Sequence, residues 1–358
     1  MDGSGSLSRH AAAVASNQGT GVERSPAIWF PAIASGTGVD HFTERLVQAL
    51  RDRGIRAAIT WLPLRAEYAP WTVRSPQPPA WANICHSNTW LHTRLLPVDI
   101  PLVATVHHCV DDPALNPYKT ALQRFYHKWW IRKLEQRVIN RAVRVAAVSA
   151  YTAKRAASIY KRPDIVTIHN GIGPDIFHPD DRDVPNEPFR LLFIGTLSKR
   201  KGADLLPLVM ERLGAEFELH YTGCPTAFGH RQALPANMIH LGRLEQSGQV
   251  ADLYRRCDAL LFPSRLEGFG LAALEAQACG RPVIATDGSA LSEVVERDNT
   301  GILCPADDVD AFVTAARRLR ADRSLWLSMG RAASRRVRGE FSEERVAQRY
   351  LDLYRSIL

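Results

Sequence analysis

The feature that most constrains the fold is a glycine-rich turn, residues 268–270, set between an apolar run and a helical stretch. The apolar run Ala259–Phe262 predicts a buried strand, and Leu271–Cys279 predicts a helix that ends at Gly280. A second apolar run, Pro282–Thr286, predicts the next strand. Such a strand–helix–strand unit is typical of an α/β protein, and the backbone N–H groups at the start of its helix suit a phosphate.

Two glutamates flank this turn. Glu267 lies directly before it, and Glu275 lies about one turn into the helix, on the face that carries Leu271. The two carboxylates therefore bracket the anion site from opposite sides. Because carboxylates repel phosphate, their expected partners are hydroxyl groups, such as those of a sugar and a ribose. A nucleotide-sugar fits this pattern; the alternative is an ordinary strand–helix–strand unit with Glu275 at the surface.

Glu267 and Glu275, separated by seven residues around Gly-Phe-Gly, resemble the paired-glutamate motif of the retaining glycosyltransferases of family GT4, the glycosyl transferases group 1. The resemblance extends from about Ala34 to the C-terminus. It implies an α/β protein with the GT-B fold, in which two Rossmann-like domains face a central cleft. It also implies that Glu267 contacts the transferred sugar and Glu275 the ribose, with the donor diphosphate at the turn and helix start, formed by Gly268, Phe269, Gly270 and Leu271.

The length of 358 residues exceeds one ordinary core and predicts two domains. The first residues, rich in serine, glycine and alanine, lack the apolar region of a signal peptide and predict a disordered tail. A polar, proline-bearing stretch near residue 185 predicts a linker. With the fold that the resemblance implies, the chain divides into a tail (1–25), an acceptor-side domain (26–180), the linker (181–188), a nucleotide-sugar domain (189–341) and a final helix that crosses back to the first domain (342–358).

A second glycine turn lies near the start of the chain. Ala27–Ile33 predicts a strand, and Gly36 and Gly38 follow it directly before a helix, where a backbone can approach an anion closely. A bare tight turn is the alternative. The resemblance to GT4 proteins places this turn in the cleft near the donor phosphates, which makes Gly36 and Gly38 candidate donor-binding residues.

Histidines follow the predicted strand Leu102–Val106. Ligands in open α/β sheets gather at the carboxyl ends of strands, and neighbouring residues point to opposite faces, so one of His107 and His108 is expected in the cleft. The GT4 resemblance selects His107 as a contact of the transferred sugar, although the family commonly has aspartate where this chain has His108. A structural role is the alternative for His107, and His86 is a further candidate for the acceptor side.

Three cations, Lys199, Arg200 and Lys201, follow a predicted strand and precede a helix. Lysine and arginine at such a place can neutralise a diphosphate and the charge that develops as it leaves. Lys201 matches the GT4 pattern, whereas Thr196 stands where the family usually has arginine. We therefore expect Lys201, and after it Arg200, at the donor diphosphate; the alternative is a solvated run of charge.

The stretch from Lys119 to Arg162 contains 12 basic residues and one acid, Glu135, in a chain whose net charge is +8. Aromatic residues recur at helical spacing in its first part and predict a helix whose apolar stripe packs on the domain core. The basic face favours an anionic surface, and membrane lipid headgroups are the hypothesis. Nucleic acid is not expected, since no recognised nucleic-acid motif is present.

No cofactor or metal site is expected. The six scattered cysteines suit a reduced, cytosolic protein, and Asp308 and Asp310 precede a predicted helix, where capping is the simpler role. No apolar run approaches the ~18 residues of a membrane span. The expected location is the cytoplasm, with peripheral attachment to the cytoplasmic face of the inner membrane as a hypothesis.

These patterns predict a retaining glycosyltransferase that moves a sugar from a UDP- or GDP-linked donor to a glycan or lipid-linked acceptor, with surface polysaccharide or lipopolysaccharide synthesis as the prior expectation. A non-catalytic nucleotide-sugar-binding scaffold at the membrane is the alternative. The donor base and the acceptor stay open. The proline-rich stretch Pro63–Pro79 predicts an irregular loop that bears on the acceptor, and residues 242–244 resemble the GT4 stretch near the donor base.

Overall fold

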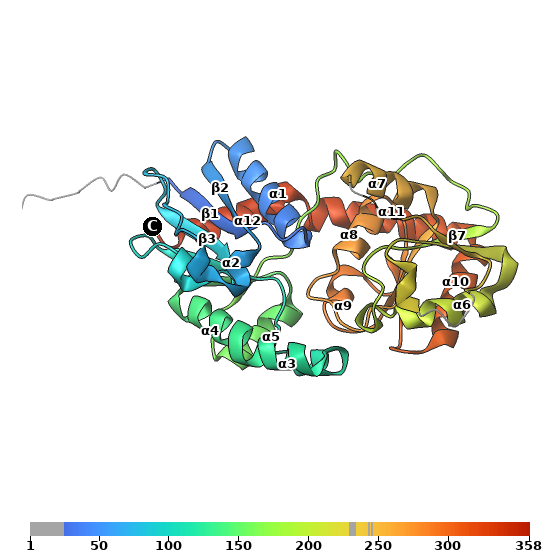
Figure 1. The fold of residues 1–358 in the computed structure, drawn as a ribbon. Helices are drawn as coiled ribbons and strands as arrows, with labels where there is room; N and C mark the ends of the chain where they lie inside the picture. Colours follow the sequence, from blue (N-terminus) through green and yellow to red (C-terminus); the bar gives the residue numbers. More distant parts are fainter. Residues whose placement is uncertain (1–24, 229–233, 243, 245) are drawn as a thin grey trace, which may run out of the picture.

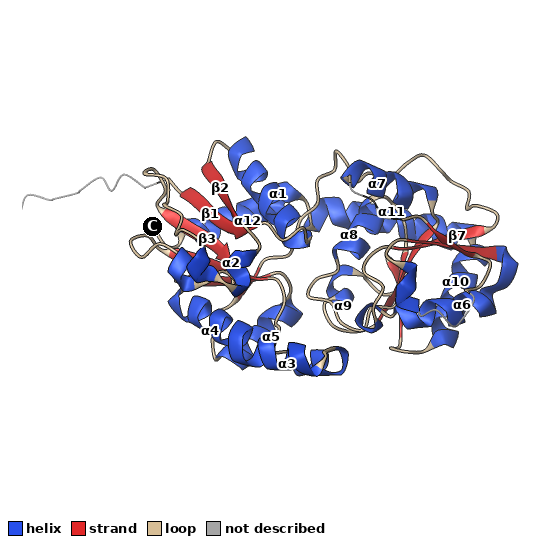
Figure 2. Cartoon of the chain, in the orientation of Figure 1, coloured by secondary structure: helices blue, strands red, loops and turns tan. Residues whose placement is uncertain are grey.

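The computed structural model describes residues 25–228, 234–242, 244 and 246–358 (Figure 1). The predicted tail lies outside these ranges except for Ser25, and so does Arg243 of the stretch assigned to the donor base. The described strands form two six-stranded sheets, one in each half of the chain, in which neighbouring strands run parallel. Helices cover the faces of both sheets (Figure 2). The expected α/β fold with two Rossmann-like domains is therefore confirmed.

The sheet of the first half has the strand order β2-β1-β3-β4-β5-β6. Two of its central strands, β1 and β4, are buried along their whole length, which agrees with their mainly apolar sequences. The helices and strands of this half are β1 (Ala27–Ile33), α1 (Gly38–Asp52), β2 (Arg56–Leu62), α2 (Arg65–Tyr68), β3 (Ile84–Asn88), β4 (Leu102–Val106), α3 (Ala121–Tyr126), α4 (Arg132–Arg141), β5 (Arg144–Ala147), α5 (Ala150–Tyr160) and β6 (Val166–Thr167).

The sheet of the second half has the order β12-β11-β10-β7-β8-β9. Asp308 caps the helix that follows its last strand, since the carboxylate accepts a hydrogen bond of 2.9 Å from the N–H of Ala311. The helices and strands of this half are β7 (Phe189–Phe193), α6 (Leu206–Leu213), β8 (Phe217–Tyr221), β9 (Met238–His240), α7 (Ser247–Arg256), β10 (Ala259–Phe262), α8 (Leu271–Ala278), β11 (Val283–Thr286), α9 (Leu291–Val294), β12 (Gly301–Cys304), α10 (Val309–Ala321) and α11 (Arg323–Glu340).

The final helix, α12 (Glu343–Arg355), returns from the second half and packs beside α1 (Figure 1). Its buried Tyr354 shares a hydrogen bond of 2.6 Å with Nδ1 of His86, whose Nε2 lies 2.8 Å from the hydroxyl oxygen of Thr105. Burial lowers the pKa of His86 to about 3. His86 therefore joins α12 to the first sheet as a neutral residue, and its place on the acceptor side stays a prediction.

Three segments differ from the sequence predictions. The stretch Pro63–Pro79 contains α2 and a 3-10 turn over Pro70–Thr72, so it is not wholly irregular. The basic helix is divided between α3 and α4 by a π turn over His127–Ile131. The 18-residue α11 was not predicted. Within the described residues, no helix is long and apolar enough to cross a membrane.

Candidate active site

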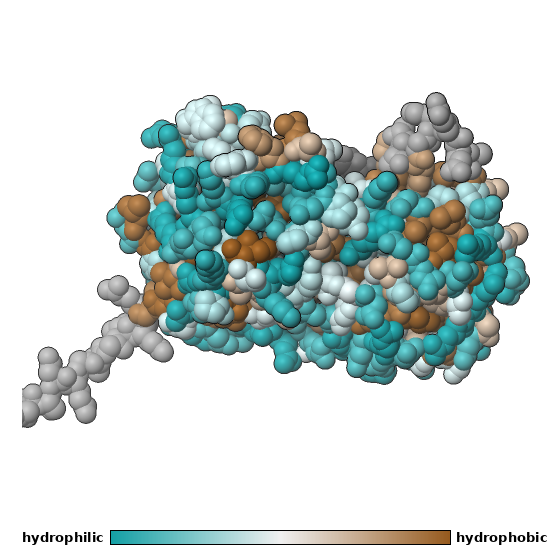
Figure 3. Space-filling model, turned by 90° about the horizontal axis from the view of Figure 1, so that it is seen from below, coloured by the Kyte–Doolittle hydropathy of each residue, from teal (hydrophilic) through white to brown (hydrophobic). Residues whose placement is uncertain are grey.

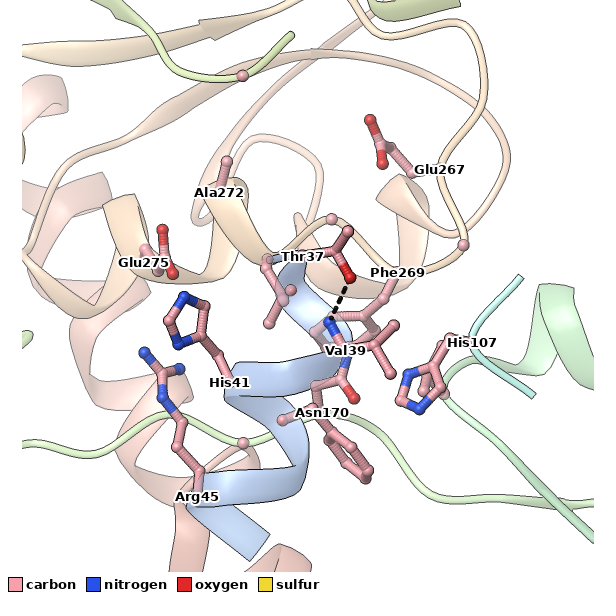
Figure 4. Close-up of a pocket in the computed structure, with 18 of the residues that line it drawn as sticks. Thr37, Val39, His41, Arg45, His107, Asn170, Glu267, Phe269, Ala272 and Glu275 are labelled. Atoms are coloured by element: carbon pink, nitrogen blue, oxygen red, sulfur yellow. Dashed lines mark hydrogen bonds between the residues drawn. The ribbon is translucent and has the colours of Figure 1, made fainter. Parts of the chain in front are cut away.

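A cavity of about 630 Å³ lies between the two halves, at the carboxyl ends of strands from both sheets (Figure 4). The first half contributes α1 and the residues that follow β4. The second half contributes the loop after β7, part of α7 and the start of α8. Most of the predicted site residues therefore meet in one place, although they come from segments far apart in the sequence.

The start of α8 lies directly against the first half. A Cβ atom on Gly268 would be 2.3 Å from the carbonyl oxygen of His107, so only glycine allows this approach. The carbonyl oxygen of Gly268 accepts hydrogen bonds from the hydroxyls of Ser149 and Thr152, at 2.6 and 2.9 Å. These contacts join the two halves beside the cavity.

The first turn of α8 has unused hydrogen-bond donors. Gly270 precedes it with φ +105° and provides no capping side chain. Among the described residues, none accepts a hydrogen bond from the N–H of Leu271 or Ala272, and both residues line the cavity. Free N–H groups at a helix start are suited to binding an anion. Phe269 also lines the cavity.

Glu267 is buried within a group of cations. Its Oε1 lies 2.5 Å from Nζ of Lys201 and 3.9 Å from the guanidinium of Arg200, and it accepts a hydrogen bond of 2.6 Å from the Ser264 hydroxyl. Burial acts to raise the pKa of Glu267, but the two cations and the hydrogen bonds outweigh it and the pKa is lowered. Glu267 is therefore ionised at neutral pH.

A close backbone approach sets the position of Lys201. The following residue, Gly202, has φ +70°, and a Cβ there would lie 2.1 Å from the carbonyl oxygen of Pro263. The 3-10 turn Lys199–Lys201 is thereby held against the loop that follows β10. Lys201 and Arg200 line the cavity, whereas Lys199 and Thr196 do not.

Glu275 lies on α8 at the other end of the cavity. Burial raises the pKa of its carboxyl to about 7, although Arg45 and the Tyr254 hydroxyl, which donates to it at 3.2 Å, act in the opposite direction. Figure 4 shows His41 and Arg45 projecting from α1 toward Glu275. The two glutamates thus differ in charge state near neutral pH.

Both histidines after β4 line the cavity, whereas one was expected. The ring of His107 packs edge-on against Phe42, with 4.7 Å between ring centroids. Burial lowers the pKa of His107 to about 4. Burial, followed by the nearby Arg200, lowers the pKa of His108 to about 4 as well. Both rings are therefore neutral at pH 7 and can each donate and accept one hydrogen bond.

The two glycines of the early turn, Gly36 and Gly38, differ in whether they line the cavity. Gly38 lines the cavity, and a Cβ on it would lie 3.3 Å from a methyl group of Leu271, so it lets the two halves meet. Gly36 does not line the cavity. Its N–H donates to the carboxylate of Asp40 at 2.7 Å, as does the N–H of Ser35 at 2.8 Å. The carboxylate therefore occupies the N–H of Gly36, which was expected to face a phosphate, and does not contact that of Gly38.

Several lining residues were not predicted: His41, Arg45, Asn170 and Glu343. Asn170 had a sequence signal, because it begins an Asn-Gly pair, which is typical of a turn. Its Oδ1 is buried without a hydrogen-bond partner among the described residues. Arg45 and Glu343 had no sequence signal. Each lies on the polar face of a helix, and the sequence does not show which other segment that face contacts.

The fold, with a cavity between two parallel α/β halves, is of the GT-B type. The chain matches the family models described as Glycosyltransferase Family 4, over residues 80–176, and Glycosyl transferases group 1, over residues 188–322. It belongs to this family, GT4, and is a glycosyltransferase.

Relatives agree with this assignment. A D-inositol 3-phosphate glycosyltransferase from Catenulispora acidiphila is 31% identical over 63% of this chain and 60% of its own length. The lipopolysaccharide core biosynthesis mannosyltransferase LpcC from Rhizobium leguminosarum is 31% identical over 71% of this chain and 74% of its own. The structure of Anabaena HepE with UDP-glucose superimposes with a TM-score of 0.69 over 93% of this chain and all of HepE, at 16% identity.

Proposed function

We propose that this protein is a retaining glycosyltransferase that moves a sugar from a UDP- or GDP-linked donor to a glycan or lipid-linked acceptor in surface polysaccharide or lipopolysaccharide synthesis. The observation that carries the proposal is the Glu267–Lys201 pair beside the N–H groups of Leu271 and Ala272, which have no acceptor among the described residues. It provides cations and N–H donors for a diphosphate next to an ionised carboxylate for sugar hydroxyls.

The proposed reaction places developing charge where these donors lie. The acceptor hydroxyl oxygen forms a bond to the anomeric carbon as the bond from that carbon to the diphosphate oxygen breaks. The electron pair of the broken bond goes to the diphosphate, and a diphosphate oxygen on the same face takes the acceptor proton. Lys201, Arg200 and the N–H groups of α8 stabilise the growing negative charge. Attack and departure on one face retain the anomeric configuration.

The remaining residues position the sugar and the nucleotide. Glu267 accepts hydrogen bonds from hydroxyls of the transferred sugar, and Glu275 accepts them from the ribose. A ring nitrogen of neutral His107 hydrogen-bonds a hydroxyl of the sugar. Gly38 brings the first half close to the donor. The protein's own cations neutralise the diphosphate in this proposal, so no metal ion takes part.

The relatives indicate which substrates to test first. HepE was solved with UDP-glucose, which supports UDP-sugars as the first donors. LpcC acts in lipopolysaccharide core biosynthesis and is a mannosyltransferase, which supports GDP-linked mannose and a lipid-linked glycan as the second set. The inositol-phosphate relatives support a small phosphorylated polyol as another acceptor.

A thermal-shift screen of the purified protein against UDP, GDP, ADP and their common sugars tests the donor site. A ligand at about 100 times its Kd stabilises a protein by about 2.7 kcal/mol, which is readily measured. We expect a shift with one nucleotide class, and its loss in Lys201→Gln. If no nucleotide or nucleotide-sugar stabilises the protein, the proposed donor site is refuted.

The proposal includes peripheral attachment to the cytoplasmic face of a membrane through α3, the π turn and α4. Leu122, Phe125 and Trp129 are 78%, 64% and 53% exposed, and the ammonium groups of Lys128 and Lys133 lie 6.0 and 4.9 Å from the Trp129 ring. Figure 3 views the molecule from below and shows separate hydrophobic areas within a mainly hydrophilic surface. Apolar side chains among cations suit an anionic lipid interface.

Part of the basic charge is already neutralised. Arg132, Arg155 and Arg162 form ion pairs with Asp111, Asp112 and Asp164. We expect co-sedimentation with phosphatidylglycerol vesicles that weakens with salt and is reduced by Trp129→Ser. Binding that depends on neither the anionic lipid nor salt would refute membrane attachment.

A further inference from the structure

A second cavity, of about 420 Å³, lies where the linker passes over α11. No described residue lines both this cavity and the one between the two halves. Its wall is formed by residues 179–183, where the first half joins the linker, by Gly280 and Arg281, and by one face of α11. It therefore belongs to neither the proposed donor site nor the proposed membrane surface.

The α11 helix carries five arginines and one acid, Glu340. Arg323 forms an ion pair with Asp183, and Arg336 forms ion pairs with Glu296 and Glu340. The other three line the cavity, and among the described residues no acidic side chain forms an ion pair with any of them. These are Arg331, Arg335 and Arg338.

These three arginines share one face of the helix, because they are spaced by four and three residues. Like charges at this spacing destabilise a helix unless a counter-charge is present. All three are exposed, so they can reach an anion in the cavity. The face therefore has a concentration of positive charge, and none of its three arginines forms an ion pair among the described residues.

The deeper wall adds buried donors. Arg281 is 3% exposed, and its guanidinium donates to Asp180 and, at 2.8 Å, to the carbonyl oxygen of Arg255. Ser334, on α11 between the arginines, is 2% exposed, and its hydroxyl has no hydrogen-bond partner among the described residues. The Nε of Arg182 is also buried without a partner among them.

The acidic side chains among residues 180–183 do not neutralise the three arginines of this cavity. Asp180 is paired with Arg281 and Asp183 with Arg323, which leaves Asp181 as the lining acid outside any ion pair among the described residues. Arg182 is itself paired with Asp258 beneath the cavity. Among the described residues, three lining arginines thus lack an ion pair, against one lining carboxylate that lacks one.

We propose that this cavity binds a small soluble phosphorylated compound through its phosphate group. Arg331 and Arg335 hold the phosphate oxygens with the forked donors that suit a phosphate, Arg338 adds charge, and the Ser334 hydroxyl donates a further hydrogen bond. The ligand is a small molecule rather than a membrane headgroup, because Ser334 and Arg281, which line the cavity, are buried. A bound phosphate links α11 to the linker between the two halves.

Trp326 allows a local measurement, because it lines the cavity and the guanidinium carbons of Arg182 and Arg281 lie 5.6 and 5.8 Å from its ring. The protein is labelled with 5-fluorotryptophan, and the Trp326 resonance is identified by its loss in Trp326→Phe. Inorganic phosphate and glucose 6-phosphate are then titrated separately at constant ionic strength. This readout does not depend on donor binding or transfer, so its outcome is distinct from that of the proposed function.

We expect a saturable shift of the Trp326 resonance. Arg331→Gln and Arg335→Gln should each raise the Kd by about tenfold or more, since each removes charge-assisted hydrogen bonds. Arg349→Gln, which removes an exposed arginine of α12 outside the cavity, should leave the Kd unchanged. The proposal is overturned if neither anion gives a saturable shift, if Arg335→Gln and Arg349→Gln behave alike, or if only phosphatidylglycerol vesicles move the resonance.

Discussion

The two ends of the main cavity carry the same side chain in opposite electrostatic settings. Glu267 lies within reach of Lys201, Arg200 and the Ser264 hydroxyl, and its pKa is lowered despite burial. Glu275 has one hydroxyl donor, Tyr254, and burial raises its pKa to about 7. The two residues are one helical turn and a glycine loop apart, so their neighbours, rather than their position in the chain, set their charge.

This difference suits two different tasks. A fixed negative charge beside Lys201 and Arg200 is suited to the part of the cavity where charge changes during transfer. A carboxyl that titrates near neutrality and lies away from these cations is suited to binding ribose hydroxyls. Four experiments test whether the two ends differ in this way, ordered here from the largest expected effect to the smallest.

Replacing Glu267 should have the largest effect. Glu267→Gln keeps the size of the side chain and removes the charge, and we expect transfer to fall by about 10²–10³-fold, the loss typical of one preorganised electrostatic group. Turnover with the donor found in the thermal-shift screen measures it. Glu216→Gln, at an exposed glutamate, is the control. Wild-type turnover in Glu267→Gln would refute its role at the transferred sugar.

Replacing Lys201 tests the Glu267 end of the cavity through its cation rather than its carboxylate. Lys201→Gln should weaken donor binding and transfer by about 10–100-fold, because a charge-assisted hydrogen bond to a phosphate is lost. Lys199→Gln is a matched control, since it removes a lysine two residues away that does not line the cavity. Isothermal titration with the nucleotide gives both affinities. Equal losses in the two variants would mean that overall charge, rather than the position of Lys201, matters.

The titration of Glu275 should make the free energy of unfolding depend on pH. Its native pKa of about 7 lies above the usual value of 4.5, so the neutral form is favoured by folding. This stabilisation is complete below about pH 4.5 and is lost as pH rises through about 7. The full shift corresponds to about 3 kcal/mol, and we expect about 2 kcal/mol because the side chain is partly exposed.

Urea unfolding between pH 5 and pH 8 measures this effect. As pH rises, wild type should lose stability relative to Glu275→Gln. Glu267→Gln should not gain stability relative to wild type in this way, because the carboxylate that it replaces has a lowered pKa. A constant difference between wild type and Glu275→Gln across this range would show that Glu275 does not titrate near neutrality.

The smallest expected effect is that of metal removal. If protein cations and α8 N–H groups neutralise the donor diphosphate, EDTA should leave transfer unchanged within about twofold, whereas a metal that holds the diphosphate would contribute several kcal/mol. Initial rates with and without EDTA, followed by added Mg²⁺, test this. A loss of transfer that Mg²⁺ restores would move diphosphate neutralisation from the protein to a metal ion.

Much of the fold followed from local patterns. The apolar runs at β1 and β4 gave their strands at the observed residues, since a strand buried on both faces has a continuous apolar sequence. The turn before α8 was also recognisable, because Gly270 and the helix that follows are adjacent in sequence. By contrast, α11 was missed although Asp322 caps it and Trp326, Met329, Ala333 and Val337 recur at helical spacing. The basic helix was predicted without its π turn, which the apolar pattern does not show.

The sequence by itself determined that Glu267, Glu275 and Lys201 stand at strand and helix ends, because this property depends on neighbours a few residues away. The two Rossmann-like domains were predicted from the chain length and the family resemblance. Only the tertiary structure decided that Arg45 approaches Glu275 from the other half, that both His107 and His108 line the cavity, and that His86 bonds to α12. It also decided which donors stay free, since the Gly36 N–H is used by Asp40. These contacts depend on how segments far apart in the chain pack together, and local sequence patterns do not show that packing.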